Sequence, residues 1–301
     1  MTTNFHTSLT NAKITKNDEF YTRLTDISKE LEHYKEHFKD KIVLCNCDNP
    51  TMSAFWEYFH INFSELGLRK LIATYYDPNN VTYKTEYNGG NDSDIKVGTK
   101  TPLKGHGDFR GKECQGMLDE VDIVATNPPF SLFRDYIDIL MQHNKKFLIV
   151  GHMNAIAYKD VFPLFKDNKV WLGVNSIKEF DTPSEDVKKF GNIHWFTNLT
   201  ITEKREWIKT TYLYSKKDIL YPNLYPKYDN YDAINVDKVS QIPMDYKGVM
   251  GVPKSFMDKF NSEQFELVSF RKGNDGKDLV YTVDGKKVYP FTRILIRFRQ
   301  N

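Results

Sequence analysis

The stretch VDIVATNPPF, residues 121–130, constrains the fold more than any other part of the sequence. Its first half is an apolar run of the kind that forms a buried strand. This run passes directly into Asn127, Pro128 and Pro129. Because proline has no amide hydrogen to donate to a neighbouring strand, the strand has to end there. The sequence therefore predicts a rigid, irregular loop at the carboxyl end of a buried strand.

Alternating strand and helix patterns surround this loop. The predicted strands cover residues 42–45, 70–76, 121–126 and 146–150, and the predicted helices cover residues 26–38, 51–63 and 132–141. Repeated units of strand, helix and strand form parallel sheets with helices on both faces. Residues 79–105 interrupt the pattern with a hairpin that turns at Gly89 and Gly90, and a second hairpin is predicted at Asp284 and Gly285. We therefore predict an α/β fold with a predominantly parallel sheet.

The composition restricts the chain only loosely. Its 301 residues suffice for one large domain with an appendage, and a formal net charge of +2 permits a polyanionic partner without requiring one. Three cysteines do not make a disulfide framework, and no stretch reaches the roughly 18 apolar residues of a membrane span. We expect a soluble, cytoplasmic protein. Near residue 200 the amino-acid composition shifts toward tyrosine, proline and lysine. We therefore expect a main domain over residues 1–200 and a smaller region over residues 201–301.

Polar residues follow the predicted strands at three further places, where ligands of open parallel sheets bind. The candidates are Asp48, Asn49 and Pro50 after the first strand, Asp77 after the second, and Asp108 and Phe109 in the segment GHGDFR. A carboxylate in the first loop can take an ammonium group, and an acid after the second strand can accept ribose hydroxyls. An acid beside a phenyl ring suits an adenine. Helix capping or turn formation is the alternative explanation in each case.

The loop that ends the Val121 strand offers chemistry of its own. The carbonyl of Pro128 and the side-chain oxygen of Asn127 are a pair of hydrogen-bond acceptors, and Phe130 presents a flat face beside them. Such a set fits a planar amino group on a stacked base. Two acceptors on the amino hydrogens stabilise the positive charge that develops when the nitrogen attacks an electrophilic methyl group. The alternative is a rigid loop with an asparagine cap.

Two histidines, His33 and His37, stand four residues apart on a predicted helix. A metal site would need at least one further ligand, which the sequence does not place beside them. We interpret both as part of a solvated helix face and predict no metal site.

Six segments resemble the EcoRI-type family of adenine-specific DNA methyltransferases, and the resemblance covers nearly the whole chain. They are KNDEFYT, VLCNCDNP, GDFR, TNPPFSLFRDYI, GNIHWFTNL and MGVPKSFMDKFNSEQFEL. The resemblance implies a Rossmann-like class I methyltransferase fold and transfer of a methyl group from S-adenosylmethionine to the N6 amino group of adenine in double-stranded DNA. It also implies a target base that is rotated out of the duplex, target recognition by residues 201–301, and a possible partner endonuclease of a restriction-modification system.

The functional residues of the family carry over onto the matching positions. The resemblance implies catalytic roles for Asn127, Pro128, Pro129 and Phe130. Together with the candidates at the strand ends, it gives a cofactor-binding set of Phe20, Tyr21, Thr22, Asp48, Asn49, Pro50, Asp77, Asp108 and Phe109. Base stacking is implied for Phe130 and for one of Trp195 and Phe196, between which the sequence does not choose.

One feature departs from the general methyltransferase pattern, because the loop after the first strand, residues 45–50, contains no glycine. This weakens a general motif argument for Asp48, although it agrees with the EcoRI-type family. Two other functions remain as alternatives. The same loop chemistry serves methylation of RNA or of a protein glutamine amide, and an inactive methyltransferase fold can act as a DNA-binding protein. The recognition sequence and the choice between monomer and dimer stay open.

Overall fold

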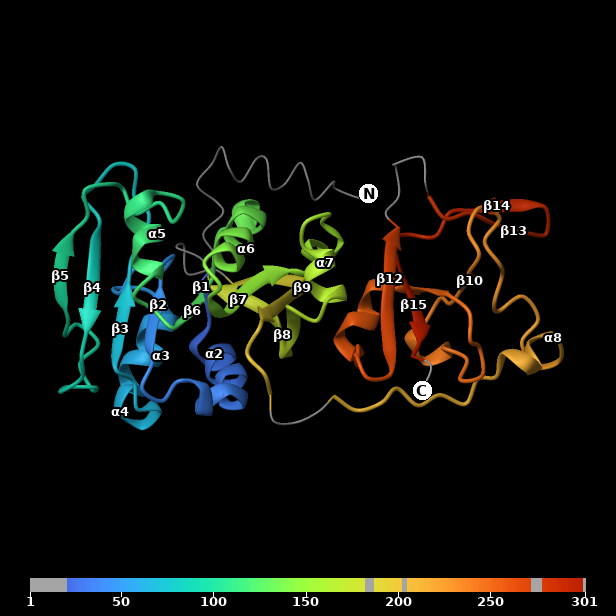
Figure 1. The fold of residues 1–301 in the computed structure, drawn as a ribbon, viewed down its shortest axis with the longest axis horizontal. Helices are drawn as coiled ribbons and strands as arrows, with labels where there is room; N and C mark the ends of the chain where they lie inside the picture. The colour runs from blue at the N-terminus through green and yellow to red at the C-terminus, as the bar shows by residue number, and fades with distance from the viewer. Residues whose placement is uncertain (1–20, 182–186, 202–204, 272–277, 300–301) are drawn as a thin grey trace. The chain divides into compact units, whose positions relative to one another are not determined.

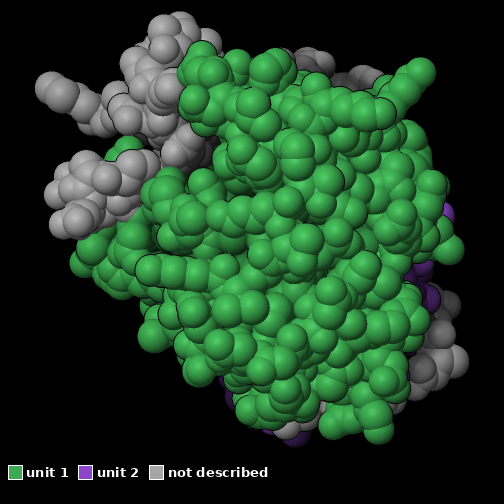
Figure 2. All heavy atoms as spheres, turned by 90° about the vertical axis from the view of Figure 1, so that its left-hand side faces the viewer, with its two compact units in different colours: residues 1–161, 170–202 green, residues 162–169, 203–301 purple. Residues whose placement is uncertain are grey.

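The computed structural model describes residues 21–181, 187–201, 205–271 and 278–299. The chain divides into two compact units, which Figure 2 colours separately. Unit 1 consists of residues 1–161 and 170–202, and unit 2 consists of residues 162–169 and 203–301. Unit 2 thus includes a short segment that the expected division at residue 200 assigned to the main domain.

A nine-stranded sheet forms the framework of unit 1 (Figure 1). Its strands follow the order β1, β8, β9, β7, β6, β2, β3, β4, β5. In chain order they are β1 (Tyr21–Thr22), β2 (Ile42–Cys45), β3 (Lys70–Ala73), β4 (Tyr83–Tyr87), β5 (Thr99–Pro102), β6 (Ile123–Thr126), β7 (Lys146–His152), β8 (Trp171–Asp181) and β9 (Val187–Thr197). The strands β7, β6, β2 and β3 run parallel to one another. The predicted α/β class with a Rossmann-like parallel sheet is confirmed.

Helices connect the parallel strands, as the alternating patterns predict. They are α2 (Leu24–Leu31), the 3-10 helix η1 (Glu32–His37), α3 (Ala54–Ile61), α4 (Phe63–Leu66), α5 (Lys112–Leu118), η2 (Phe130–Leu132), α6 (Phe133–Gln142) and η3 (Met153–Ala157). Ser53 caps α3, because its hydroxyl accepts hydrogen bonds from the amides of Phe55 and Trp56 at 3.1 and 3.2 Å. The cap of this helix is therefore neither Asp48 nor Asn49.

The order of the parallel strands reverses at β2. The chain passes from β2 through α3 and α4 to β3 on one side, whereas β6 pairs with β2 on the other side. In open α/β sheets such a reversal leaves a crevice at the carboxyl ends of the two adjacent strands. The loops that follow β2 and β6 begin at Asn46 and Asn127. The fold therefore brings two of the loops selected from the sequence to one edge of the sheet.

The interrupting hairpin joins the sheet and extends its edge (Figure 1). Strand β4 pairs antiparallel with β3, and β5 pairs antiparallel with β4. The second strand of the hairpin begins only at Thr99, so the connection between β4 and β5 is longer than the turn predicted at Gly89 and Gly90. The turn between the strands is tied to α3, since the indole of Trp56 donates to the carbonyl oxygen of Ile95 at 2.9 Å.

Unit 2 is built on a four-stranded sheet in the order β10, β11, β15, β12. Its strands are β10 (Ile234–Asn235), β11 (Met250–Pro253), β12 (Phe265–Arg271) and β15 (Arg293–Phe298), and a separate hairpin contains β13 (Tyr281–Val283) and β14 (Lys286–Val288). Its short helices are α7 (Phe162–Lys166), η4 (Tyr214–Lys216), α8 (Lys217–Leu220), η5 (Val239–Gln241) and η6 (Lys254–Lys259). Asp284 and Gly285 have φ values of +50° and +74°, which confirms the predicted hairpin turn. In the described parts of both units, every helix is too short or too polar to cross a membrane.

Replacing Trp195 by alanine is expected to lower the free energy of unfolding by about 3–5 kcal/mol, because the indole is fully buried and its removal leaves a cavity. Chemical denaturation followed by circular dichroism measures the change. Val187→Ala on the same strand is the control, since Val187 is 48% exposed, and it should cost less than about 1 kcal/mol. Equal losses for the two variants would contradict the core position of Trp195.

Candidate active site

The loop after β2 is organised around Asp48, which is only 7% exposed. The amide of Asp48 donates to the carbonyl oxygen of Thr74, just past the end of β3, at 2.9 Å. One carboxylate oxygen accepts from the Ser53 hydroxyl at 2.6 Å, and the other accepts a short hydrogen bond from the Thr126 hydroxyl at the end of β6. Asp48 therefore joins the carboxyl ends of three neighbouring parallel strands.

The surroundings of Asp48 make its negative charge costly. Burial raises the pKa of Asp48 from its ordinary value of 3.8 to about 6, although the hydrogen bonds from Ser53 and Thr126 act in the opposite direction. Hydroxyl groups supply dipoles but no positive charge, and a buried carboxylate is stabilised most by a cation. A ligand with an ammonium group would offset the cost of burial here.

The same loop meets the segment that contains Phe109. The hydroxyl of Tyr136 on α6 donates to the side-chain oxygen of Asn46, the first residue after β2. The ring of Tyr136 contacts the ring of Phe109 edge to face, with 4.8 Å between the ring centroids. Phe109 therefore lies beside the loop after β2, although some sixty residues separate them in the sequence.

The segment GHGDFR passes close to the end of β3. The amide of Asp77 donates to the carbonyl oxygen of His106 at 3.1 Å. Gly107 adopts a φ of +74°, and a Cβ atom at this position would overlap the carbonyl oxygen of Tyr75. Glycine is required here because the approach is tight and the backbone is left-handed. This close approach holds the acid and the phenyl ring of the segment next to the loop that carries Asp77.

Asp77 and Asp108 both organise local turns. The carboxylate of Asp77 accepts from the amide of Asn79 and from the side chain of Asn80, each at 2.9 Å. Asp108 accepts from the amide and the guanidinium of Arg110 at distances from 2.7 to 3.0 Å, and these hydrogen bonds lower the pKa of Asp108. The turn-forming explanation of both acids therefore holds, and a ligand role for either stays a prediction.

The remaining cofactor candidates lie at the margins of this arrangement. The side-chain oxygen of Asn49 accepts from the amide and the hydroxyl of Thr51 at 3.1 and 2.9 Å, and Pro50 is buried beside it. Tyr21 and Thr22 form β1, which pairs with β8 and contacts α3. They therefore lie near the helix that follows the Asp48 loop. The candidate Phe20 lies outside the described residues.

Asn127 directly follows β6, whose last residue is Thr126. The hydroxyl of Thr126 donates to Asp48. Asn127 therefore directly follows the residue whose hydrogen bond connects the end of β6 to the loop after β2. The side chain of Asn127 is half-buried. The irregular loop predicted from the sequence thus begins at the junction of the two strands where the sheet order reverses.

The rest of this loop turns the chain into α6. Pro128 is buried and Pro129 is half-buried, and η2 starts directly afterwards at Phe130. The ring of Phe130 is 9% exposed and packs edge to face against Phe180, with 6.2 Å between the ring centroids. The two prolines therefore separate a β-strand from a helical segment within three residues.

Trp195 and Phe196 are neighbours on β9 and therefore point to opposite faces of the sheet. Trp195 packs against Phe55 and Phe196 packs against Phe133, with 5.9 and 4.9 Å between the ring centroids. Both side chains are fully buried. Neither ring presents an accessible face in this structure, and their role in base stacking stays a prediction.

Comparison with known proteins identifies the family of the chain. The family model described as adenine-specific methyltransferase EcoRI matches residues 8–294. The chain belongs to this family.

Similarity to individual members extends over nearly the whole of this EcoRI-type methyltransferase. It is 45% identical to the type II methyltransferase M.EcoRI of Escherichia coli, with 95% of this chain and 94% of that protein covered. It is 39% identical to the type II methyltransferase M.MpnI of Mycoplasma pneumoniae, with 96% and 98% covered. No solved structure matches the chain. The chain is thus a site-specific DNA adenine methyltransferase, as its motifs imply.

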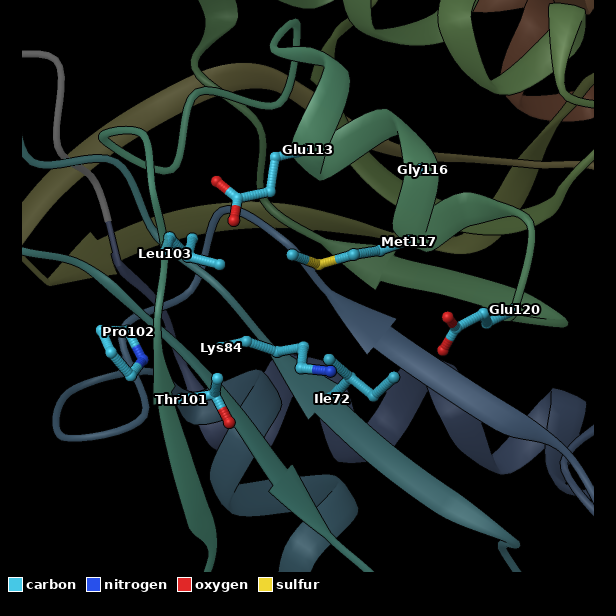
Figure 3. Close-up of a pocket in the computed structure, with 9 residues that line it drawn as sticks. All are labelled: Ile72, Lys84, Thr101, Pro102, Leu103, Glu113, Gly116, Met117 and Glu120. Atoms are coloured by element: carbon cyan, nitrogen blue, oxygen red, sulfur yellow. The ribbon is translucent and has the colours of Figure 1, made fainter.

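A pocket of about 270 Å³ in the methyltransferase lies between the β4–β5 hairpin and α5 (Figure 3). It is lined by Ile72, Lys84, Thr101, Pro102, Leu103, Glu113, Gly116, Met117 and Glu120. None of the predicted site residues lines it. Lys84 pairs with Glu86 at 3.0 Å, and Glu113 accepts from the amides of Lys104 and Gly105 at 3.1 and 3.0 Å. The pocket is therefore separate from the loops at the strand ends that carry the predicted site residues.

Sequence reasoning missed three residues that connect the loops of the EcoRI-type site, namely Ser53, Thr126 and Tyr136. Thr126 is the polar member of an otherwise apolar strand, and it directly precedes Asn127. That position is a usable signal, because a buried hydroxyl needs a partner. Ser53 and Tyr136 carry no comparable signal, since their hydrogen bonds depend on how helices and strands are arranged.

Metal ligands do not gather in the described part of the methyltransferase. No group of three or more histidine, cysteine, aspartate or glutamate side chains there could hold a metal ion. Of the histidine pair noted in the sequence, His37 contacts the carbonyl oxygen of Thr200 through its Nε2 atom at 2.6 Å.

Replacing Asp48 by asparagine is expected to change how the stability of the apo enzyme depends on pH. The pKa of Asp48 is raised to about 6 in the folded protein, so a buried charge destabilises the fold above pH 6 but not below pH 3.8. Asp48→Asn cannot ionise and should gain stability relative to the natural chain as the pH rises from 4 to 7, by on the order of 3 kcal/mol.

Urea denaturation of both proteins across this pH range measures the difference. Asp119→Asn is the control, because the side chain of Asp119 is 78% exposed. A difference between Asp48→Asn and the natural chain that stays constant with pH would show that Asp48 carries no buried charge.

Proposed function

We propose that this EcoRI-type methyltransferase transfers the methyl group of S-adenosylmethionine to the N6 amino group of an adenine that has been rotated out of duplex DNA. The observation that carries the proposal is the hydrogen bond between Asp48 and Thr126. This hydrogen bond holds the loop after β2, which is suited to the methyl donor, beside the loop that begins with Asn127. Group transfer needs such fixed positions, because the reacting atoms have to be held about 3–3.5 Å apart in line.

The residues at the strand ends fit S-adenosylmethionine by their chemistry. Asp48 would hold the ammonium group of its methionine part, since its present hydrogen-bond partners are uncharged hydroxyls. Asp77 would accept from the ribose hydroxyls, and the adenine would lie against Phe109 with its amino group donating to Asp108. The remaining proposed contacts are Phe20, Tyr21, Thr22, Asn49 and Pro50. When bound, S-adenosylmethionine supplies an electrophilic methyl group.

The proposed catalytic groups are the side-chain oxygen of Asn127 and the carbonyl oxygen of Pro128. Both would accept hydrogen bonds from the amino group of the target adenine. An aryl amine is a weak nucleophile because its lone pair is delocalised into the ring. Two acceptors favour a pyramidal nitrogen and stabilise its positive charge as the new N–C bond forms, before one amino proton is released. Pro129 would keep the Pro128 carbonyl out of regular secondary structure.

The target base needs a surface on which to stack. We assign this role to Phe130, together with Trp195 or Phe196. Phe130 is the candidate that the site supports best, because it belongs to the catalytic loop itself and is slightly exposed. For Trp195 or Phe196 to take part, the side chains of Phe55 or Phe133 would have to move away from them.

The charge distribution favours a nucleic acid as the substrate, and the family of the chain favours DNA. Residues 203–301 contain 18 lysines and arginines against 13 acidic residues, a formal charge of +5, whereas the whole chain carries +2. Residues 1–202 therefore carry −3. Phosphate contacts come mostly from lysine and arginine, so we place DNA binding largely on the C-terminal region. RNA and protein glutamine amides are the alternative substrates, and a cognate endonuclease is a possible partner.

The proposal is tested by incubating the purified protein with methyl-labelled S-adenosylmethionine and, in parallel, with unmethylated duplex DNA, RNA and a protein extract. Nucleoside and amino-acid analysis then locates the label. N6-methyladenine in DNA is the expected product. Label confined to RNA or protein would keep the catalytic loop but overturn the substrate.

Asn127→Ala is expected to lower the rate of methyl transfer by at least a hundredfold, because one of the two acceptors on the amino group is lost. Binding of S-adenosylmethionine, followed by calorimetry, should stay within about twofold of the natural enzyme. Asn127→Asp retains a side-chain oxygen acceptor and should keep more activity than Asn127→Ala. Turnover of Asn127→Ala at the natural rate would remove Asn127 from the reaction.

Replacing Lys286 and Lys287 by glutamate is expected to weaken binding to duplex DNA. The slope of the logarithm of the binding constant against the logarithm of the salt concentration should become shallower by about two, because each lost phosphate contact contributes about one. Filter binding between 50 and 300 mM salt, for instance, provides the slope. The control is the double variant Lys96→Glu and Lys100→Glu, two exposed lysines of unit 1 with the same change in net charge. Equal slopes for the two double variants would place phosphate binding elsewhere.

A further inference from the structure

Unit 2 presents two aromatic side chains to solvent just before β15. Phe291 is 77% exposed and Tyr289 is 62% exposed. Pro290 stands between them, and Lys286 and Lys287 precede them on β14. Single exposed apolar side chains are common on protein surfaces, so exposure alone does not indicate a function. The support and the charge around these rings give a stronger indication.

A polar network fixes the backbone that carries Phe291. The guanidinium of Arg293, whose side chain is 11% exposed, donates to the carbonyl oxygen of Phe291 at 3.1 Å. It also donates to the side-chain oxygens of Asn235 and Asp237, both at 3.0 Å. The hydroxyl of Tyr228 donates to the same oxygen of Asn235 at 2.8 Å. Phe291 is therefore exposed on an ordered support and not on a loose loop.

A cation lies over the exposed ring. The Nζ atom of Lys254 is 5.5 Å from the ring centroid of Phe291. The two residues come together because β11 and β15 pair with Pro253 opposite Arg293. The nearby acidic side chain of Asp237 is already paired with the guanidinium of Arg293. The ring thus stands beside a lysine, with two more exposed lysines a few residues earlier in the chain.

We infer that the residues Lys254, Lys286, Lys287, Tyr289 and Phe291, here named the aromatic-lysine surface, dock on duplex DNA, and that Phe291 inserts between two base pairs. The inference rests on the proposed function, from which it takes duplex DNA as the substrate. Lysine ammonium groups neutralise phosphates, and apolar side chains that enter a base step unstack and bend the duplex.

Three features of this surface favour DNA over a protein partner. Its charged members are all lysines, which suits a polyanion. They belong to the region of the chain with a formal charge of +5. A ring on a rigid support also inserts with little loss of conformational freedom. The duplex has to be deformed in any case when the target base is rotated outward.

The binding test compares Phe291→Ala with Phe291→Trp and with Ile219→Ala. Ile219 is the matched control, since it is 79% exposed on α8 of the same unit and lies outside the aromatic-lysine surface. All variants should keep the natural melting temperature, because the replaced side chains are exposed. The probe is a fluorescent duplex selected by binding to the natural enzyme from a random pool. Phe291→Ala should bind it about ten- to a hundredfold more weakly, Phe291→Trp within about threefold, and Ile219→Ala unchanged.

Insertion of Phe291 between base pairs is measured separately from binding of the duplex. The base analogue 2-aminopurine, placed in turn at each step of the selected duplex, becomes more fluorescent where the stack opens. The natural enzyme should give one such step besides the target base. Phe291→Ala should lose the signal at that step, and Phe291→Trp should retain it.

Unchanged DNA affinity of Phe291→Ala would overturn the inference, and so would a natural enzyme that opens no step besides the target base. A change in self-association, seen by sedimentation without a change in DNA affinity, would assign the surface to a protein contact and overturn the inference as well. These readouts are binding and unstacking, whereas the proposed function is read by the methylated product. An enzyme that binds and opens the duplex but forms no N6-methyladenine would therefore overturn only the proposed function.

Discussion

The hydrogen bond between the buried carboxylate of Asp48 and the hydroxyl of Thr126 is the interaction on which the proposed active site depends. Backbone pairing alone joins β2 to β6 through Val43 and Leu44, before either strand ends. Beyond those pairs, β2 and β6 each continue into a loop. The side chain of Asp48 continues the connection past the last backbone pair. The backbone amide of Asp48 adds a hydrogen bond to the carbonyl oxygen of Thr74 beyond β3. Three loops from distant parts of the sequence thereby keep fixed positions relative to one another.

Side-chain hydrogen bonds also explain how the loop after β2 is shaped without a glycine-rich sequence. A glycine-rich turn lets the backbone approach a ligand closely because it has no side chains in the way. In this chain, residues 45–50 fold into a loop through side-chain hydrogen bonds, from Tyr136 to Asn46 and from Ser53 and Thr126 to Asp48. The glycine that this site does require is Gly107, on the opposite segment, where the backbone passes against Tyr75.

The sequence predicted the parallel part of the sheet well, because buried parallel strands are continuous apolar runs with a strong local signal. It predicted β5 poorly, since all four residues of that strand are exposed and show no hydrophobic period. The aromatic pair Trp195 and Phe196 marks a second limit. The family resemblance implied that one of these rings stacks on a base, but their burial is set by Phe55 and Phe133 on α3 and α6, which are far away in the sequence. The sequence predicted loops at the strand ends because apolar runs precede them, whereas it did not predict the hydroxyls of Ser53, Thr126 and Tyr136 that join these loops.

The uneven charge of the chain has a physical consequence for how the methyltransferase handles DNA. A formal charge of −3 on residues 1–202 gives no general attraction to phosphate, although these residues contain the catalytic loop. Under the proposed function, the charge of +5 on residues 203–301 would supply that attraction. Under the proposed function, binding energy from phosphate contacts would contribute to the cost of rotating the target base out of the stack. The side-chain partners of Asp48 are the hydroxyls of Ser53 and Thr126, which is why we propose the ammonium group of a methyl donor as the cation for this carboxylate.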